Sequence, residues 1–178
     1  MSDRKCLICS MEGVEPLARV FRDQHWAGEV APGYEVPGWF FLRVRRHAEK
    51  LTGLNDTEVA GFGRHAHDLV SAVERVTGAP AVYLLSFGEN YTHFHALVCA
   101  RGTDVPPEQR SGALLKLVSD GRDPAAAQAL AARGAHRLRG DRSGSRSGPG
   151  RLTAKAQTTS VVKEGPQHDR DRGIDHRY

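Results

Sequence analysis

Short runs of valine and aromatic residues in the first hundred positions have the pattern of β-strands. Three of them, at 18–23, 26–30 and 39–44, are separated by stretches that contain glycine or proline. Two more follow at 81–87 and 92–100, with Gly88-Glu89-Asn90 as the turn between them. The runs predict the strands of one antiparallel sheet.

A helical pattern lies between these two groups of strands. Asn55 is followed three residues later by Glu58, which is the spacing of a capping box at a helix start. Apolar residues then recur at helical spacing as far as Gly78-Ala79-Pro80, namely at Val59, Phe62, Ala66, Leu69, Val70 and Val73. The order predicts an α+β fold, in which one long helix packs on a face of the sheet.

The C-terminal third changes character twice. Pro106 and Pro107 precede an apolar run at 113–118, and Asp123-Pro124 opens an alanine-rich helix that we expect to end near Arg133. The segment from Gly134 to Tyr178 is rich in Arg, Gly, Ser and Asp, which predicts a disordered basic tail. The expected organisation is a folded domain at 1–120, a short helix at 121–133 and a tail at 134–178.

The net charge of +4 belongs to this tail. Residues 134–178 hold ten Lys and Arg against five Asp and Glu, so residues 1–133 hold 15 against 16 and are nearly neutral. Nucleic acid is therefore not an expected partner, although weak binding through the tail is an alternative that rests on charge alone. The sequence shows neither a membrane span nor an apolar signal region, so we expect a cytoplasmic protein without a membrane partner.

A C-x-x-C pair near the N-terminus, Cys6 and Cys9, suggests a metal site. Structural zinc takes four thiolate or imidazole ligands, and His47 and His93 are candidates for the other two. Such a site would stabilise the N-terminal segment on the sheet, whereas the alternative is a pair of free thiols in a frayed terminus. The third cysteine, Cys99, is expected to be a small core residue.

His93 and His95 share one face of the last predicted strand, together with Leu97, because side chains alternate along a strand. This spacing alone is weak evidence for a function. If His93 binds metal, His95 stays free beside the turn at 88–90. The backbone N–H groups of that turn and the amide of Asn90 suit phosphate oxygens. His65 and His67, on different faces of the long helix, are expected at the surface.

Taken in order, these motifs resemble the histidine-triad family, in particular its bacterial members of the dinucleoside-polyphosphate-hydrolase type. The similarity covers about Cys6 to Asp120. The matching pieces are Cys6-Leu7-Ile8-Cys9, Val36-Pro37-Gly38-Trp39-Phe40-Phe41-Leu42, Arg45-Arg46-His47, Leu54-Asn55-Asp56-Thr57-Glu58, and the run from Gly88 through His93-Phe94-His95 to Val98.

The resemblance implies a homodimer that binds a purine nucleotide or a dinucleoside polyphosphate. It implies structural zinc at Cys6, Cys9, His47 and His93. His95 would be the nucleophile that attacks the α-phosphorus and forms a nucleotidyl-histidine. The phosphate or nucleotide would contact Gly88, Glu89, Asn90 and His93, and the strand that begins at His25 and Trp26 would help to wall the base, although Trp26 fits a core position equally well.

The third histidine of the family motif is missing here. We align His93 with the first histidine, His95 with the second and Leu97 with the third; the other register, with His93 second and His95 third, needs an insertion before Arg101. Leucine cannot donate a hydrogen bond, and losing one such donor costs about 3 kcal/mol, or roughly a hundredfold in rate. Glu89 also stands where the family has an amide.

Two functions therefore remain. The first is hydrolysis or nucleotidyl transfer at a phosphoanhydride or a phosphoramidate. The second is a catalytically degenerate, zinc-bound module for nucleotide binding or dimerisation.

Overall fold

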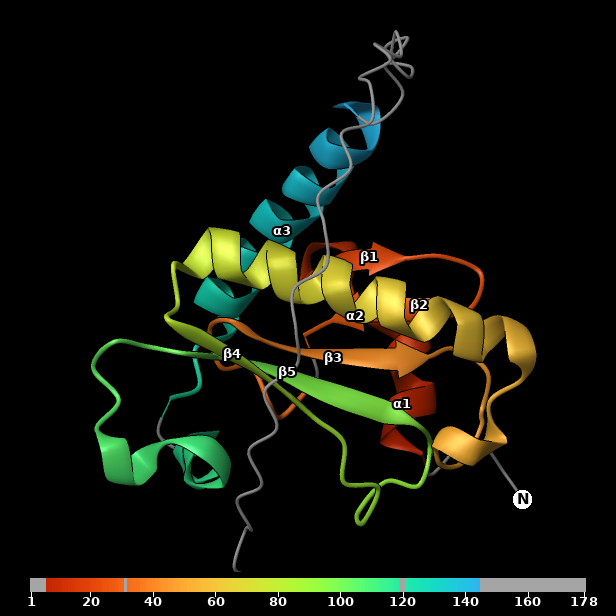
Figure 1. Ribbon diagram of the computed structural model, residues 1–178, viewed down its shortest axis with the longest axis horizontal. Coiled ribbons are helices and arrows are strands. Elements are labelled where there is room, and N and C mark those ends of the chain that lie inside the picture. The colour runs from red at the N-terminus through yellow and green to blue at the C-terminus, as the bar shows by residue number, and fades with distance from the viewer. Residues whose placement is uncertain (1–5, 31, 119–120, 145–178) are drawn as a thin grey trace, which may run out of the picture. The chain divides into compact units, whose positions relative to one another are not determined.

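Five strands form one antiparallel sheet in the computed structural model, which describes residues 6–30, 32–118 and 121–144. The strand order is β1-β2-β3-β5-β4 (Figure 1). Their bounds are β1 Arg19–Arg22, β2 Trp26–Glu29, β3 Trp39–Val44, β4 Ala81–Leu85 and β5 His95–Arg101. All five predicted strands are thus confirmed.

The last strand begins at His95 rather than at Thr92 as predicted. The preceding residues pair with the loop after β3: His93 forms an isolated bridge with Glu49, and the amide of Phe94 donates to the carbonyl of Ala48 at 2.7 Å. Because of this pairing, His93 lies outside the β4–β5 pair and close to the N-terminal segment. The pairing also explains how two nearby histidines come to have different surroundings.

The long helix α2, Asp56–Thr77, lies on one face of the sheet as predicted. The side chain of Asn55 accepts from the Glu58 amide while the Glu58 carboxylate accepts from the Asn55 amide, so the capping box is complete. Gly78 ends the helix in the left-handed conformation, with φ of 65°. The buried side of α2 packs against the sheet through Ala66, Leu69, Ala72 and Val73.

The alanine-rich helix predicted from Asp123-Pro124 is α3, which spans Pro124–Gly144. Its predicted end near Arg133 is therefore wrong. Residues 134–144 of the predicted disordered tail are helical because an apolar stripe of small residues continues past Gly134, and Ala127, Ala131, Ala135 and Leu138 are all buried. A Cβ at Gly134 would lie 3.2 Å from Cγ1 of Val20. This glycine is a packing contact and not a helix terminus. The rest of the predicted tail, 145–178, lies outside the described residues.

A second apolar cluster covers the opposite face of the sheet, which Figure 1 shows with α1 on the side away from α2. It joins α1, Leu7–Ser10, and the 3₁₀ segment Ser111–Val118 to the sheet residues Phe41, Leu97 and Cys99. Cys99 is fully buried, as expected, and burial raises the pKa of its thiol to about 12. The candidate site lies on this face. No helix within the described parts of the chain is long and apolar enough to cross a membrane.

Candidate functional site

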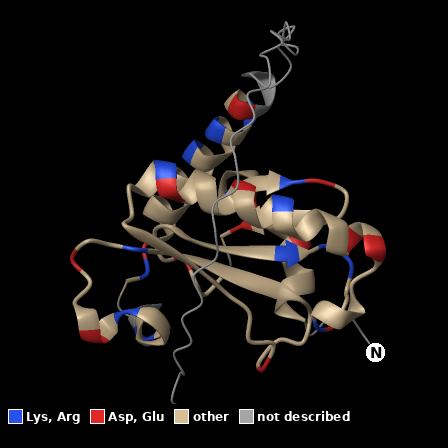
Figure 2. Cartoon of the chain, viewed as in Figure 1, with Lys and Arg blue, Asp and Glu red and all other residues tan. Residues whose placement is uncertain are grey.

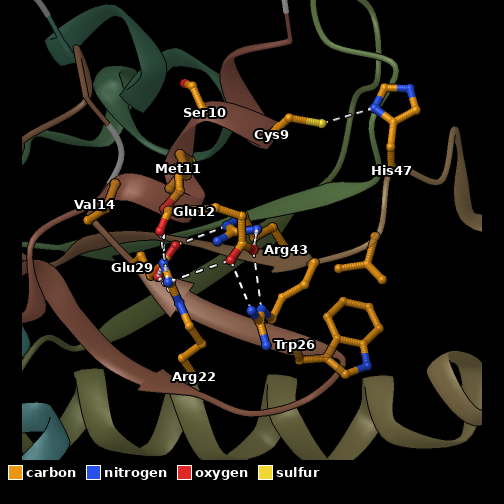
Figure 3. A network of polar contacts seen from close by, with 12 residues as sticks. Cys9, Ser10, Met11, Glu12, Val14, Arg22, Trp26, Glu29, Arg43 and His47 are labelled. Carbon is orange, nitrogen blue, oxygen red and sulfur yellow. Dashed lines mark hydrogen bonds and ion pairs between the residues drawn. The ribbon is translucent and has the colours of Figure 1, made fainter. Parts of the chain in front are cut away.

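Four side chains from three distant segments meet at one end of the sheet. Cys6 and Cys9 come from α1 and the residue before it, His47 follows β3, and His93 precedes β5. Cys9 Sγ lies 3.2 Å from His47 Nδ1, a pair visible in Figure 3, and 3.3 Å from His93 Nδ1. Cys6 Sγ lies 3.6 Å from His93 Nδ1, and the four ligand atoms all lie within 4.8 Å of one another.

The donor set and its spacing fit a tetrahedral zinc ion. Zn–S bonds of about 2.3 Å and Zn–N bonds of about 2.0 Å place sulfur and nitrogen ligands about 3.5 Å apart in a tetrahedron. The three sulfur–nitrogen distances above fall close to that value. Two thiolates with two imidazoles are also a common ligand set for structural zinc.

An outer hydrogen bond orients the imidazole ring of His93 toward the cluster. His93 Nε2 donates to the carbonyl oxygen of Val44 at 2.8 Å, which leaves the lone pair on Nδ1. Burial lowers the pKa of His93 to about 4, so the ring is neutral and able to bind a cation at neutral pH. His47 Nε2 lies 3.7 Å from Oε1 of Glu49, which is an electrostatic contact and not a hydrogen bond.

A cavity of about 380 Å³ opens beside β5 on the face of the second apolar cluster. Its volume is within the range of small-molecule sites. Four of the residues predicted for the nucleotide site line it: His95, Gly88, Glu89 and Asn90. The fifth, His93, does not line this cavity, because it is fully buried in the Cys/His cluster.

His95 is held in one tautomer within this cavity. Its Nδ1 lies 2.8 Å from the backbone carbonyl of His93, and because a carbonyl can only accept, Nδ1 carries the proton. Burial lowers the pKa of His95, which keeps the ring neutral and its lone pair on Nε2. The ring packs against Phe41 with centroids 5.0 Å apart. The geometry leaves an imidazole nitrogen with its lone pair unused by the His93 contact at the cavity wall.

The charge of the cavity is unusual for a site expected to hold phosphate. Among the described residues that line it, Glu89 is the only charged one and none is a lysine or an arginine. Figure 2 shows that single acidic position on the loop between β4 and β5. Leu97, at the place expected for a third histidine, also lines the cavity. Polar contacts to a phosphate must therefore come from His95, Asn90, the loop amides and hydroxyl groups.

A buried network of charges, which the sequence did not reveal, supports the same face (Figure 3). Arg43 of β3 is fully buried; its Nε donates to Glu29 Oε2 at 2.9 Å, and its Nη1 donates to Glu12 Oε1 at 2.8 Å. Arg22 and Arg45 complete the network around the same two carboxylates. Glu12 follows α1, and Arg43 lies directly opposite His95 in the β3–β5 pair, so the network links the cysteine-bearing segment to the strand partner of His95.

The structure decides between the two alternatives for Trp26 and corrects the expectation for His65. Trp26 is fully buried on the helical face of the sheet, where its Nε1 donates to the carbonyl of Glu58; it takes the core position and walls no part of the cavity. His65 is not a solvated surface residue, since its side chain is 14% exposed, bonds to Asp23 and stacks on Phe21. The cause is the same in both cases: the β1–β2 hairpin closes against α2. His67, 77% exposed, is at the surface as expected.

Comparison with known proteins identifies the fold. No protein-family model matches the sequence, and no curated protein matches it. A hypothetical histidine triad nucleotide-binding protein from Sulfolobus tokodaii superposes with a TM-score of 0.59 at 15% identity, over 76% of this chain and 93% of that one. A zinc-bound histidine triad family protein from Mycobacterium smegmatis superposes with a TM-score of 0.57 at 19% identity, over 79% and 99%.

A uridylyltransferase has a related structure as well. Its TM-score is 0.59 at 21% identity, over 78% of this chain and 47% of that longer chain. Together these likenesses show that the described chain has the fold of the histidine-triad proteins. At identities this low, the likenesses establish the fold only. What the site can do chemically depends on its own residues.

Proposed function

We propose that this protein is a member of the histidine-triad superfamily that binds a nucleotide and acts at its α-phosphate, as a hydrolase or as a nucleotidyl transferase, with His95 as the nucleophile. The observation that carries the proposal is the tautomer of His95. Its Nδ1–H is engaged with the His93 carbonyl, so Nε2 is free to attack in a cavity bordered by the turn at 88–90.

The reaction would proceed in two displacements. The Nε2 lone pair forms a P–N bond while the bond from phosphorus to the leaving oxygen or nitrogen breaks, and the leaving atom keeps the electron pair and takes a proton from solvent. A water molecule then attacks phosphorus, the P–N bond breaks, and its electron pair returns to Nε2 as water loses a proton. Throughout, the His93 carbonyl stabilises the charge that develops on the imidazole through Nδ1–H.

Zinc at Cys6, Cys9, His47 and His93 would have a structural role in this proposal. When bound, it would supply four bonds that join the N-terminal segment to the end of β3 and the start of β5. With all four positions of a tetrahedral ion taken by protein ligands, no position is left for substrate. The zinc-bound relative supports this assignment.

The ligand we propose is a purine nucleotide or a dinucleoside polyphosphate bound to a homodimer. Support for the nucleotide comes from the structural likeness to the Sulfolobus protein, a hypothetical nucleotide-binding protein, and from the aromatic walls of the cavity, Tyr34, Phe41, Phe87 and Tyr91. The homodimer rests on the resemblance alone.

A second candidate function is favoured by one observation, the apolar Leu97 beside His95 in the cavity wall. Without a third imidazole, the chain would be a binding or dimerisation module that has kept the zinc cluster and lost turnover. The two functions differ in whether a nucleotidyl group becomes attached to His95.

The deciding experiment is turnover of adenosine 5′-phosphoramidate and diadenosine polyphosphates by the full chain, with trapping of a nucleotidyl adduct on acid quench. We expect turnover and an adduct that both vanish in His95→Ala. His67→Ala is the matched control, because His67 is exposed and remote from the cavity. AMP binding by calorimetry without turnover or adduct would instead establish the binding module.

A further inference from the structure

Leu97 cannot donate a hydrogen bond to phosphate, as the histidine expected at its position would. Other side chains that can donate line the same cavity. Besides His95 and Asn90, the side chains in its wall that can donate a hydrogen bond are the hydroxyl groups of Tyr34 and Tyr91. A phenol keeps its proton at neutral pH and so donates to an anion at no electrostatic cost. No other described residue of the wall offers a side-chain O–H group.

Tyr91 is placed beside the proposed nucleophile. It lies in the loop between β4 and β5, four residues before His95, and its ring meets that of His95 edge to face with centroids 6.1 Å apart. Leu97 lines the same cavity. A phosphorus within reach of His95 therefore lies near Tyr91 and near the position that a third imidazole would occupy.

Tyr34 lines the same cavity and interacts with Tyr91. Its ring packs on Phe41, with centroids 5.3 Å apart, and Phe41 in turn packs on His95. Burial raises the pKa of Tyr34, and its interaction and hydrogen bond with Tyr91 raise it further. A phenol can accept one hydrogen bond and donate another, so Tyr91 can accept from Tyr34 while its own proton points to an anion.

We propose that the hydroxyl group of Tyr91, oriented by Tyr34, donates to the phosphate oxygen in place of the missing third imidazole. This inference rests on the proposed function and deepens it, since it explains how the cavity can stabilise phosphate charge without a histidine at position 97. Tyr91 is then a catalytic residue and Tyr34 a positioning residue.

Three phenylalanine substitutions test the proposal in the full chain with adenosine 5′-phosphoramidate as substrate. In Tyr91→Phe we expect kcat to fall about a hundredfold, the effect of removing one positioned donor. Tyr34→Phe should lower kcat less, by roughly tenfold. Tyr83→Phe is the matched control and should keep the wild-type kcat, because Tyr83 packs in the same apolar cluster but lies outside the cavity lining. Zinc content should stay unchanged in all three.

A rescue experiment separates a donor role from a merely structural one. Introducing Leu97→His into Tyr91→Phe should restore much of the lost kcat, which a packing defect would not allow. A wild-type kcat in Tyr91→Phe, or an equal loss in Tyr83→Phe, overturns the inference even if Leu97→His fails to fold. Wild-type chain that binds AMP but shows neither turnover nor adduct overturns the proposed function as well, so the two failures are distinguishable.

Discussion

Arg43 and Glu29 are two charged residues with no exposed surface, and their burial needs a compensating network. Removing such ions from water costs several kcal/mol each unless their hydrogen bonds are satisfied. Arg22 donates to Glu29 as well as to the carbonyls of Met11 and Glu12, and Glu12 closes the network by bonding both Arg43 and Arg45. The network thereby fastens the segment after α1 to the sheet.

Glu12 makes this network sensitive to acid. Hydrogen bonds from Arg45 and Arg43 lower the pKa of Glu12 from 4.5 to about 2. Because the folded-state pKa is depressed, the stabilisation is fully present above pH 4.5 and is lost as the pH falls toward 2. With its side chain 39% exposed, solvent screening reduces the effect to about 1 to 2 kcal/mol.

We therefore expect Glu12→Gln to lower the free energy of unfolding by that amount at pH 7 and by progressively less below pH 4.5, measured by urea denaturation. Glu15→Gln is the control, because Glu15 is exposed, and metal release in acid affects both variants alike. A difference between the variants that does not depend on pH would contradict the assignment.

At the scale of elements, α3 packs through small side chains rather than large ones. Its buried alanines and Gly134 bring the helix close to β1 and α2, since a Cβ at Gly134 would meet Val20 at 3.2 Å and Ala72 at 3.9 Å. Gly140, on the same helix, is exposed and has open space at its Cβ position. The two glycines thus have opposite roles in one helix.

This difference predicts opposite effects of leucine. Gly134→Leu would force α3 away from its contacts and lower stability by about 2 kcal/mol or more, as overpacking does. Gly140→Leu would gain helix propensity and raise stability by up to about 1 kcal/mol. Thermal unfolding of the two variants beside the wild type measures both; equal shifts would show that α3 does not pack as described.

At the scale of the whole molecule, the Cys/His cluster is the point where three segments far apart in sequence converge. The N-terminal segment contributes two ligands, the loop after β3 one and the approach to β5 one. His93 pairs with the loop after β3 and not with β4, and this pairing places it in the cluster. Occupation of the site would therefore stabilise the whole cavity-bearing face.

Removal of zinc should accordingly destabilise the chain. We expect a chelator to lower the melting temperature of the wild type by on the order of 10 °C, and to have no effect on Cys9→Ser, which should already melt at the lower value. Cys99→Ala is the control, because Cys99 lies in the core outside the cluster and its variant should retain one zinc per chain by elemental analysis. A wild-type chain that contains no zinc after growth in zinc-rich medium, and whose melting temperature a chelator does not change, would refute a structural zinc site.

Local patterns in the sequence were enough to predict the sheet, the capped helix, the C-x-x-C pair and the turn beside His95. They are enough because strand alternation, a capping box and a C-x-x-C pair depend on neighbours a few residues away. His47 and His93 were only candidates for the other two ligands until the family resemblance selected them.

Only the tertiary structure decided the rest. It showed that α3 continues past Gly134, that Trp26 and His65 close the hairpin against α2, and that Tyr34 and Tyr91 line the same cavity. These features depend on contacts between residues far apart in the chain. From the sequence alone, a charged residue such as Arg43 is expected at the surface. The burial of Arg43 beside Glu29 depends on which strands become neighbours in the sheet.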